Sequence, residues 1–160
     1  IFNNGQIDNN IYSFKDVYYD LERVYKLAFE SGKHSRFLLD ENFSQENFEN
    51  MYKTWIDNSI NGSFAHDLLY KIENEIVGLL TYQINNNTSS VGLIGILNTH
   101  QGNGIGGKML KHLESVLFTL GIKTLTIPTQ HENKLACSFY KKQGYEIKEI
   151  TFIKHYWKKI

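Results

Sequence analysis

The sequence contains one cysteine, Cys137, and one proline, Pro128. A single cysteine excludes a disulfide within the chain, and such cysteine usage is typical of a reducing compartment, so we expect a cytoplasmic protein. Net charge is lacking as well, because seventeen lysines and arginines balance seventeen aspartates and glutamates. No basic block or stripe is present, which argues against a nucleic-acid-binding protein.

Long hydrophobic runs are also missing. The longest apolar stretches have the length of a strand, far short of the ~20 residues that a membrane-spanning helix needs, and no signal peptide is visible. The chain has 160 residues, of which 41% are hydrophobic, enough for one domain with a proper core. It begins at Ile1 rather than Met, which is compatible with a fragment or domain of a longer protein.

Glycine is concentrated where an apolar stretch, 91–97, gives way to a predicted helix. Gly102, Gly104 and Gly106 open that helix. Because glycine has no Cβ, a ligand can approach its backbone closely. The first amides of a helix have no partner within it, and the N-terminus favours an anion. The sequence therefore predicts a loop that binds a phosphate or pyrophosphate.

Two motifs and one plain alternative compete for this loop. Residues 102–107 satisfy the dinucleotide fingerprint G-x-G-x-x-G, but that site also needs a carboxylate at the end of the next strand, and 124–129 carries none. A glycine-rich turn without a ligand is the second alternative, although each glycine weakens the helix start by roughly 1 kcal/mol relative to alanine. Residues 101–106 fit a different phosphate motif, Arg/Gln-x-x-Gly-x-Gly/Ala.

Hydrophobic periodicity and turn residues predict a mixed α/β (α+β) fold with the element order ααβββαβαβ. Ser44 is the expected N-cap of the second helix. We expect helices at 16–32, 44–59, 104–120 and 132–143, and strands at 67–72, 76–84, 90–97, 123–128 and 145–155.

A second motif follows in residues 133–145, which read Asn-x-x-Ala-x-x-Phe-Tyr-x-x-x-Gly-Tyr. Together with the loop at 101–106, this pattern resembles the GCN5-related N-acetyltransferases (GNAT). The resemblance implies a single acetyltransferase domain over residues 1–160. Its mixed central sheet would have two splayed parallel strands and flanking helices. It also implies that acetyl-CoA is the cofactor and that no metal is needed.

The resemblance places the cofactor against the backbone before the loop, the loop itself and the following helix. The implied cofactor-binding residues are Ile96, Leu97, Gln101, Gly102, Asn103, Gly104, Ile105, Gly106, Asn133, Ala136 and Tyr140. Tyr140 is the implied catalytic acid that protonates the departing thiolate. Tyr140 as an ordinary half-buried helix residue, and Asn133 as a plain helix start, remain alternatives. We expect Cys137 to pack in the core rather than act as a nucleophile.

The implied reaction is direct attack of a primary amine on acetyl-CoA in a ternary complex. For an amine with a pKa of about 10.4, deprotonation at pH 7 costs about 4.6 kcal/mol, so a general base is expected. Asp40, Glu41 and His34 are all candidates for this base. A backbone amide around Leu97 is the expected partner of the developing oxyanion.

A finer resemblance concerns residues 35–43, 48–59 and 154–157. These segments are similar to TDP-4-amino-4,6-dideoxygalactose (TDP-fucosamine) N-acetyltransferases, which implies a nucleotide-linked amino sugar as acceptor. Those enzymes are often longer at the N-terminus, so a partner subunit in a homodimer is one way to complete the nucleotide pocket. Arg36 and His34 are candidate substrate-binding residues, because a guanidinium suits a diphosphate. Tyr82 is a third, by stacking on a sugar or base.

Two of these candidate substrate-binding residues also have a purely structural interpretation. Arg36 can equally be a solvated loop arginine or pair with Asp40, and Tyr82 can equally pack in the core. Two functional alternatives also stay open. One is a GNAT enzyme that acetylates another amine, such as a peptide N-terminus, a polyamine or an antibiotic. The other is a non-catalytic acyl-CoA-binding module.

Overall fold

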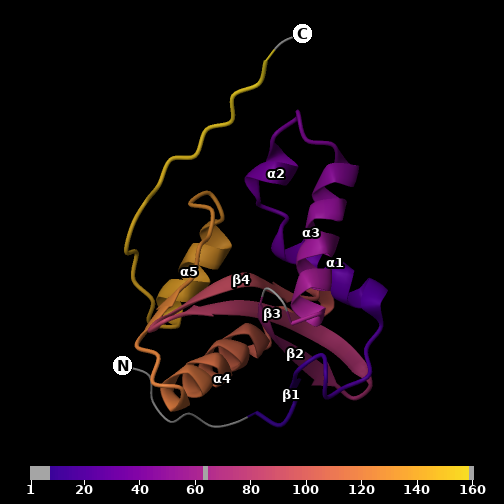
Figure 1. Ribbon diagram of the computed structural model, residues 1–160, viewed down its shortest axis with the longest axis vertical. Helices are drawn as coiled ribbons and strands as arrows, with labels where there is room; N and C mark the ends of the chain where they lie inside the picture. The colour runs from indigo at the N-terminus through magenta and orange to yellow at the C-terminus, as the bar shows by residue number, and fades with distance from the viewer. Residues whose placement is uncertain (1–7, 63–64, 159–160) are drawn as a thin grey trace. The chain divides into compact units, whose positions relative to one another are not determined.

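The computed structural model describes residues 8–62 and 65–158, and the chain forms two compact units (Figure 1). The large unit comprises Ile1–Pro128 and the small unit Thr129–Ile160. The residues at 1–7, 63–64 and 159–160 lie outside the described part.

A mixed sheet forms the centre of the large unit. Over its described residues, the sheet has five strands in the order β1-β2-β3-β4-β5. The first four pair antiparallel, whereas β4 and β5 pair parallel. This confirms the mixed α/β fold class that the sequence predicts. The strands are β1 (Ile11–Tyr12), β2 (His66–Ile72), β3 (Glu75–Asn85), β4 (Thr88–Ile96) and β5 (Thr124–Thr126).

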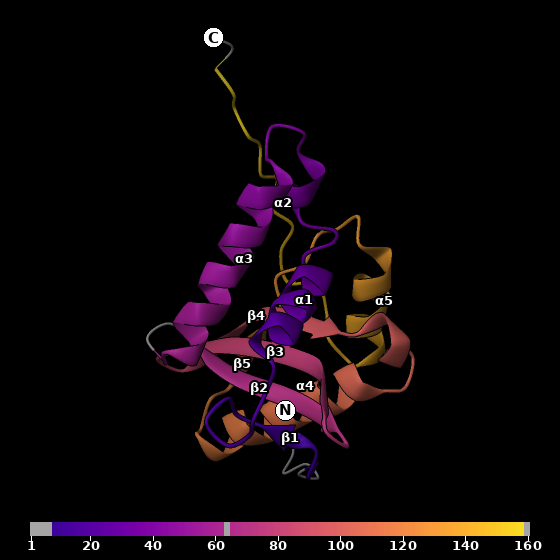
Figure 2. The same ribbon diagram turned by 90° about the vertical axis from the view of Figure 1, so that its right-hand side faces the viewer.

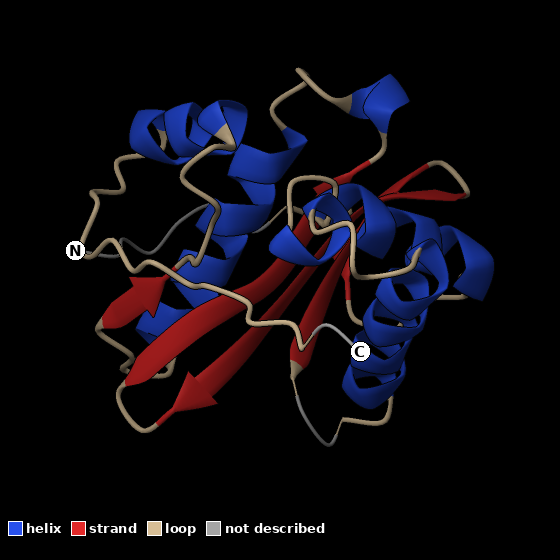
Figure 3. Cartoon of the chain, turned by 90° about the horizontal axis from the view of Figure 1, so that it is seen from above, coloured by secondary structure: helices blue, strands red, loops and turns tan. Residues whose placement is uncertain are grey.

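Helices cover both faces of this sheet (Figure 3). Helices α1 (Leu21–Ser31) and α3 (Gln45–Ile60) lie on one face, and α4 (Ile105–Thr119) lies on the other, as the labels of Figure 1 show. Two short elements complete the unit, namely α2 (Arg36–Leu39) and the 3-10 turn η1 (Asn98–His100). The sequence predicts neither of these turns, nor the two-residue strand β1, because such short elements carry no clear periodicity.

The helix starts follow from side-chain caps. The Ser44 hydroxyl accepts from the Asn47 amide at 3.1 Å, which confirms the predicted start of α3. The predicted start of the first helix at residue 16 is wrong by five residues. Asp20 is its N-cap, with extended backbone and a carboxylate that accepts from the Glu22 amide at 3.0 Å. A capping side chain of this kind bonds a free amide of the first turn and so fixes the residue at which the helix begins.

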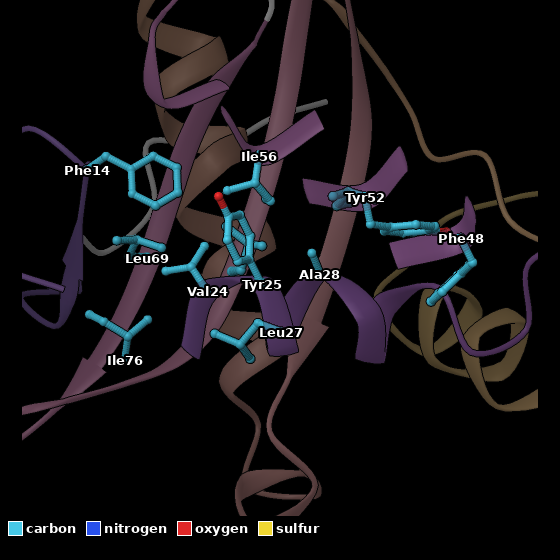
Figure 4. Packing of buried hydrophobic residues seen from close by; sticks show 12 residues of the cluster. Phe14, Val24, Tyr25, Leu27, Ala28, Phe48, Tyr52, Ile56, Leu69 and Ile76 are labelled. Carbon is cyan, nitrogen blue, oxygen red and sulfur yellow. The ribbon is translucent and has the colours of Figure 1, made fainter. Parts of the chain in front are cut away.

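The core between α1, α3 and the sheet consists of aliphatic and aromatic side chains (Figure 4). Val24 and Leu27 of α1, Ile56 of α3 and Leu69 of β2 are fully buried, and each such side chain contributes about 1.5–3 kcal/mol. Burial and a hydrogen bond to Asp57 raise the pKa of the Tyr25 phenol to about 12.

The small unit contains α5 (Lys134–Lys142). The Asn133 side chain accepts from the Ala136 amide at 3.1 Å and caps this helix, and Gly144 follows its end with a φ of 91°. The predicted strand at 145–155 is wrong, because the described residues after α5 belong to no helix or strand. Alternation of apolar and polar side chains in a segment shows only that the segment has the propensity to form a strand. A strand also needs a hydrogen-bonded neighbour, and no described residue provides one for this segment.

Candidate functional site

The glycine loop at the start of α4 is exposed, and its backbone is unusual. Gly102 and Gly104 have φ values of 80° and 75°, a left-handed conformation that other residues rarely adopt. No described heavy atom other than those of their chain neighbours lies within 4 Å of a Cβ placed at either position. The glycines are therefore required by the backbone conformation, and the space before them is open.

The start of α4 has the features of an anion site. Its N-cap is Gly104, which has no side chain to bond the first amides of the helix. Ile105 is 4% exposed and packs in the core, so it presents its amide rather than its side chain to the loop. Gly106 is half-buried in the first turn. Uncapped amides at a helix N-terminus are suited to a phosphate group.

Polar side chains of the loop hold its own backbone. Gln101 Nε2 donates to the carbonyl of Ile96 at 2.9 Å, and Asn103 Nδ2 donates to the carbonyl of His100 at 3.2 Å. The His100 amide in turn donates to the carbonyl of Leu97 at 2.8 Å. These bonds fix the path of the chain from the end of β4 to the start of α4.

Strand β4 runs on well past the end of its pairing with β5. The parallel register covers only Thr88 to Ser90, opposite Thr124 to Thr126, whereas β4 continues to Ile96. The last residues of β4 thus have a strand neighbour on the β3 side only. This open edge of β4 is where the sequence resemblance places the divergence of the two parallel strands.

Backbone hydrogen bonds show which groups of β4 face this open edge. The Leu97 amide donates to the carbonyl of Val77 at 2.9 Å, and the Leu93 amide donates to Thr81 Oγ1 at 3.0 Å. Bonding groups alternate along an antiparallel strand, so the amide and carbonyl of Ile96 point away from β3. Of the amides around Leu97, where we expect the oxyanion partner, that of Leu97 itself is engaged with β3, whereas that of Ile96 points toward the open edge.

The motif residues of the small unit lie on or next to α5. Burial raises the pKa of the Tyr140 phenol to about 12, and the nearby Cys137 thiol adds to the shift. The Tyr140 ring lies 5.2 Å from the ring of Phe139, centroid to centroid. Ala136 is half-buried. The Asn133 side chain is used as the helix cap described above, as the plain alternative for this residue predicts.

The predicted acceptor-side residues lie in three different environments. His34 is exposed in the turn after α1. The Arg36 guanidinium stacks on the ring of Phe37 at 4.3 Å, and its buried Nε has no hydrogen-bond partner among the described residues. Tyr82 is 7% exposed, stacked on His66 at a ring distance of 5.1 Å.

Tyr82 lies on the face of the sheet that carries α4. Even-numbered residues of β3 from Gly78 onward face α4, as shown by the Cβ position of Gly78, 3.0 Å from Met109 Sδ. Tyr82 shares this face and lies in the core, because side chains two residues apart on a strand point the same way. Its burial favours the packing alternative that the sequence leaves open.

A hollow of about 410 Å³ opens beside the end of β4, on the face that carries α1. Sequence reasoning missed it, because its walls come from two segments far apart in the chain and its α1 residues have ordinary helical spacing. The lining residues are Lys26, Phe29 and Glu30 of α1, and Leu97, Asn98 and Thr99 after β4.

Comparison with known proteins identifies the family. The model of the acetyltransferase (GNAT) family matches residues 19–145. The chain belongs to this family. A curated relative is the spore coat polysaccharide biosynthesis protein SpsD of Bacillus subtilis (strain 168), 25% identical over 138 residues, which are 86% of this chain and 48% of SpsD. The chain thus spans about half the length of this relative.

Solved structures of low sequence identity share the fold. A tetramutant of the BH1408 protein from Bacillus halodurans has a TM-score of 0.69 at 14% identity, covering 91% of this chain and 99% of its own. The PaiA N-acetyltransferase from Thermoplasma acidophilum, solved in complex with coenzyme A, has a TM-score of 0.64 at 20% identity, covering 88% and 91%.

These findings confirm the GNAT fold and acetyl-CoA as the cofactor. The structure fits that cofactor, because the open glycine loop and the uncapped start of α4 provide donors for a pyrophosphate. In the described part of the chain, no helix combines the length and apolar character that a membrane crossing requires.

Proposed function

We propose that the chain is an N-acetyltransferase that moves an acetyl group from acetyl-CoA to the primary amine of a nucleotide-linked amino sugar. The observation that carries the transferase part is the open glycine loop after the end of β4, which has no strand partner on the β5 side. The acceptor rests on the resemblance of residues 35–43, 48–59 and 154–157 and on SpsD, a protein named for polysaccharide biosynthesis.

The loop supplies the pyrophosphate site in this proposal. Gly102, Gly104 and Gly106 present their amides, with those of Asn103 and Ile105 between them, to the two phosphates. The side chains of Gln101 and Asn103 hold the loop rather than contact the ligand, since both bond to carbonyls of the chain itself. Their loss would therefore weaken binding through the shape of the loop.

The end of β4 holds the thioester end of the cofactor. Its open edge offers main-chain groups that can hydrogen-bond the pantetheine amides, so the pantetheine takes the place of a neighbouring strand. We assign the carbonyl oxygen of the acetyl group to the Ile96 amide, which points away from β3, in place of the engaged Leu97 amide. A fixed backbone donor stabilises negative charge on that oxygen as the amine attacks.

Tyr140 is the proposed proton donor to the CoA sulfur, with Asn133 and Ala136 beside it in the cofactor-binding motif. Burial keeps the pKa of its phenol at about 12, so the hydroxyl carries its proton at neutral pH. A neutral phenol can donate to the thiolate as the carbon–sulfur bond breaks.

The amine of the acceptor must lose a proton, and the phosphates of the acceptor must bind a cationic side chain. Arg36 remains our candidate for the phosphates, because its buried Nε has no partner among the described residues. Exposed His34 is the second candidate there and also a candidate base. Asp40 and Glu41 remain base candidates. The Asp40 carboxylate already accepts from the Asn42 amide at 3.0 Å.

The test is thiol release from acetyl-CoA in the presence of TDP-4-amino-4,6-dideoxygalactose. The matched control is the TDP sugar with a hydroxyl in place of the amine. We expect release that depends on the amine. Clear CoA binding without release would retain the fold and cofactor, reject the sugar, and direct the search to peptide, polyamine or antibiotic amines. CoA binding with no turnover of any amine would identify a non-catalytic acyl-CoA-binding module.

A further inference from the structure

The hollow beside β4 is built by tight packing within the large unit. Figure 2 shows α1 lying over the central strands. The contact is closest at Gly95, where an added Cβ would lie 2.3 Å from the carbonyl oxygen of Leu27. Backbone therefore packs on backbone at this point. The α1 wall of the hollow and its β4 wall are held together by the core rather than by mobile side chains.

One carboxylate in the lining is held in place by two neighbours. The Glu30 Oε2 atom forms an ion pair with Lys33 Nζ at 2.5 Å, and its side chain is 22% exposed. With the Asn98 amide nitrogen turned toward Glu30, it donates to the same Oε2 at 3.0 Å and its oxygen accepts from Lys33 Nζ at 3.1 Å, in place of the contact between Asn98 Oδ1 and Gln101 Nε2. Glu30 is thus oriented by Lys33, just after α1, and by Asn98 from the β4 wall of the hollow.

We propose that Glu30 binds the amino group of the acceptor in this hollow, an inference that rests on the proposed acetyltransferase function. Both fixed contacts of Glu30 are made through Oε2, so we assign Oε1 to the incoming ammonium. Ile96, which we assign to the acetyl oxygen, directly precedes Leu97 in the wall of the hollow. An amine bound at Glu30 would therefore lie at the end of β4 where the acetyl group is held.

The rest of the lining indicates the kind of acceptor. Phe29 and Leu97 offer apolar surface, whereas the exposed Lys26 places a cation in the lining. A substrate that suits these walls carries a primary ammonium on a compact body with an apolar edge and a negative group nearby. A deoxyamino sugar linked to a diphosphate has all three features. A polyamine lacks the negative group and would be repelled by Lys26 and Lys33.

The experiment compares three variants of the full chain: Glu30→Gln, Glu30→Asp and Glu22→Gln. Glu22 is an exposed residue in the first turn of the same helix, so it controls for loss of one negative charge on α1. We expect Glu30→Gln to raise the KM for the amino sugar about 10- to 100-fold, as for a lost charge-assisted hydrogen bond. The KM of Glu30→Asp should lie between those of the wild type and Glu30→Gln, and the KM of Glu22→Gln should match that of the wild type.

CoA affinity, measured by calorimetry on each variant, shows that the fold and the cofactor site are intact. Equal KM values for Glu30→Gln and Glu22→Gln, with turnover retained, would overturn the assignment of Glu30 and leave the proposed function standing. A wild type that binds CoA but releases no thiol with the amino sugar would overturn the proposed acceptor, and the inference with it. The two failures are therefore distinguishable.

Discussion

Gly95 on β4 and Gly104 before α4 lie close in the sequence, yet a side chain at each would meet opposite surroundings. At Gly95 it would collide with the backbone of α1, 2.3 Å from the Leu27 carbonyl oxygen. At Gly104 it would enter open space, and the constraint is a φ of 75°. One glycine allows two elements to pack, and the other shapes a loop around space that a ligand can fill.

This difference separates what the fold needs from what binding needs. A packed position without positive φ contributes to stability, because any added atom must displace its neighbours. An open position with positive φ costs only the strain of a left-handed backbone, about 1–2 kcal/mol, when it is changed, but the added side chain also blocks a ligand that approaches the backbone. Substitutions at the two kinds of position should therefore affect different measurements.

The largest effect is expected at the packed position. Gly95→Ala should lower the free energy of unfolding by about 3 kcal/mol, because the backbone oxygen of Leu27 cannot move without shifting α1. Urea unfolding measures this change. The control is Gly78→Ala, whose Cβ would meet side-chain atoms, two of them the flexible ends of Ile96 and Met109. It should lose clearly less stability, and equal losses would contradict the comparison.

The next effect concerns the open loop. Gly104→Val should reduce CoA affinity at least about 100-fold, or 2.7 kcal/mol, because the side chain occupies the space of the phosphates. Gly121→Val is the matched control, since Gly121 follows the other end of α4 with a φ of 73° and equally open surroundings. Both variants should lose about 1–2 kcal/mol of stability from backbone strain. Unchanged CoA affinity in Gly104→Val would refute the loop assignment.

A smaller effect on the chemical step is expected from the small unit. Tyr140→Phe should slow turnover about 100-fold, the lower end of general acid catalysis, with CoA affinity nearly unchanged. Stopped-assay turnover and calorimetry on the same preparation separate the two quantities. Equal turnover in the variant would remove Tyr140 from the mechanism.

The smallest effect is one of pH. A phenol pKa of about 12 keeps Tyr140 protonated throughout the range from neutral pH to pH 10, so its ionisation should not reduce kcat there. The acid form is lost only as the pH rises through the raised pKa. The pH profile of kcat for the wild type tests this. A decline centred near pH 10 that disappears in Tyr140→Phe would show an unshifted phenol.

Sequence patterns correctly predicted the features that depend only on residues close together in the chain. The Ser44 cap fixes the start of α3 through its own backbone neighbours, and the loop motif at 101–106 places glycines where the structure has a left-handed backbone before α4. The first helix starts later than periodicity indicates, because Asp20 caps it. The predicted strand at 145–155 failed because strand formation depends on a partner as well as on the segment itself.

The hollow beside β4 could not be predicted in the same way. Glu30 occupies an ordinary position on an amphipathic helix, and nothing in its own segment distinguishes it from the exposed Glu22. Its environment arises from packing of α1 on Gly95, which brings in Asn98 from a segment far along the chain. Sites assembled by such packing carry no local motif, whereas the phosphate loop is one continuous segment.

The most direct test of the central claim, that the loop before α4 binds the pyrophosphate of CoA, is a calorimetric titration of the wild type and Gly104→Val with CoA and with pantetheine, which lacks the pyrophosphate and the nucleotide attached to it. The wild type should bind CoA at least about 100-fold more tightly than pantetheine, and Gly104→Val should lose that preference. Equal affinities of the wild type for the two ligands, or a preference that survives in Gly104→Val, would contradict the account.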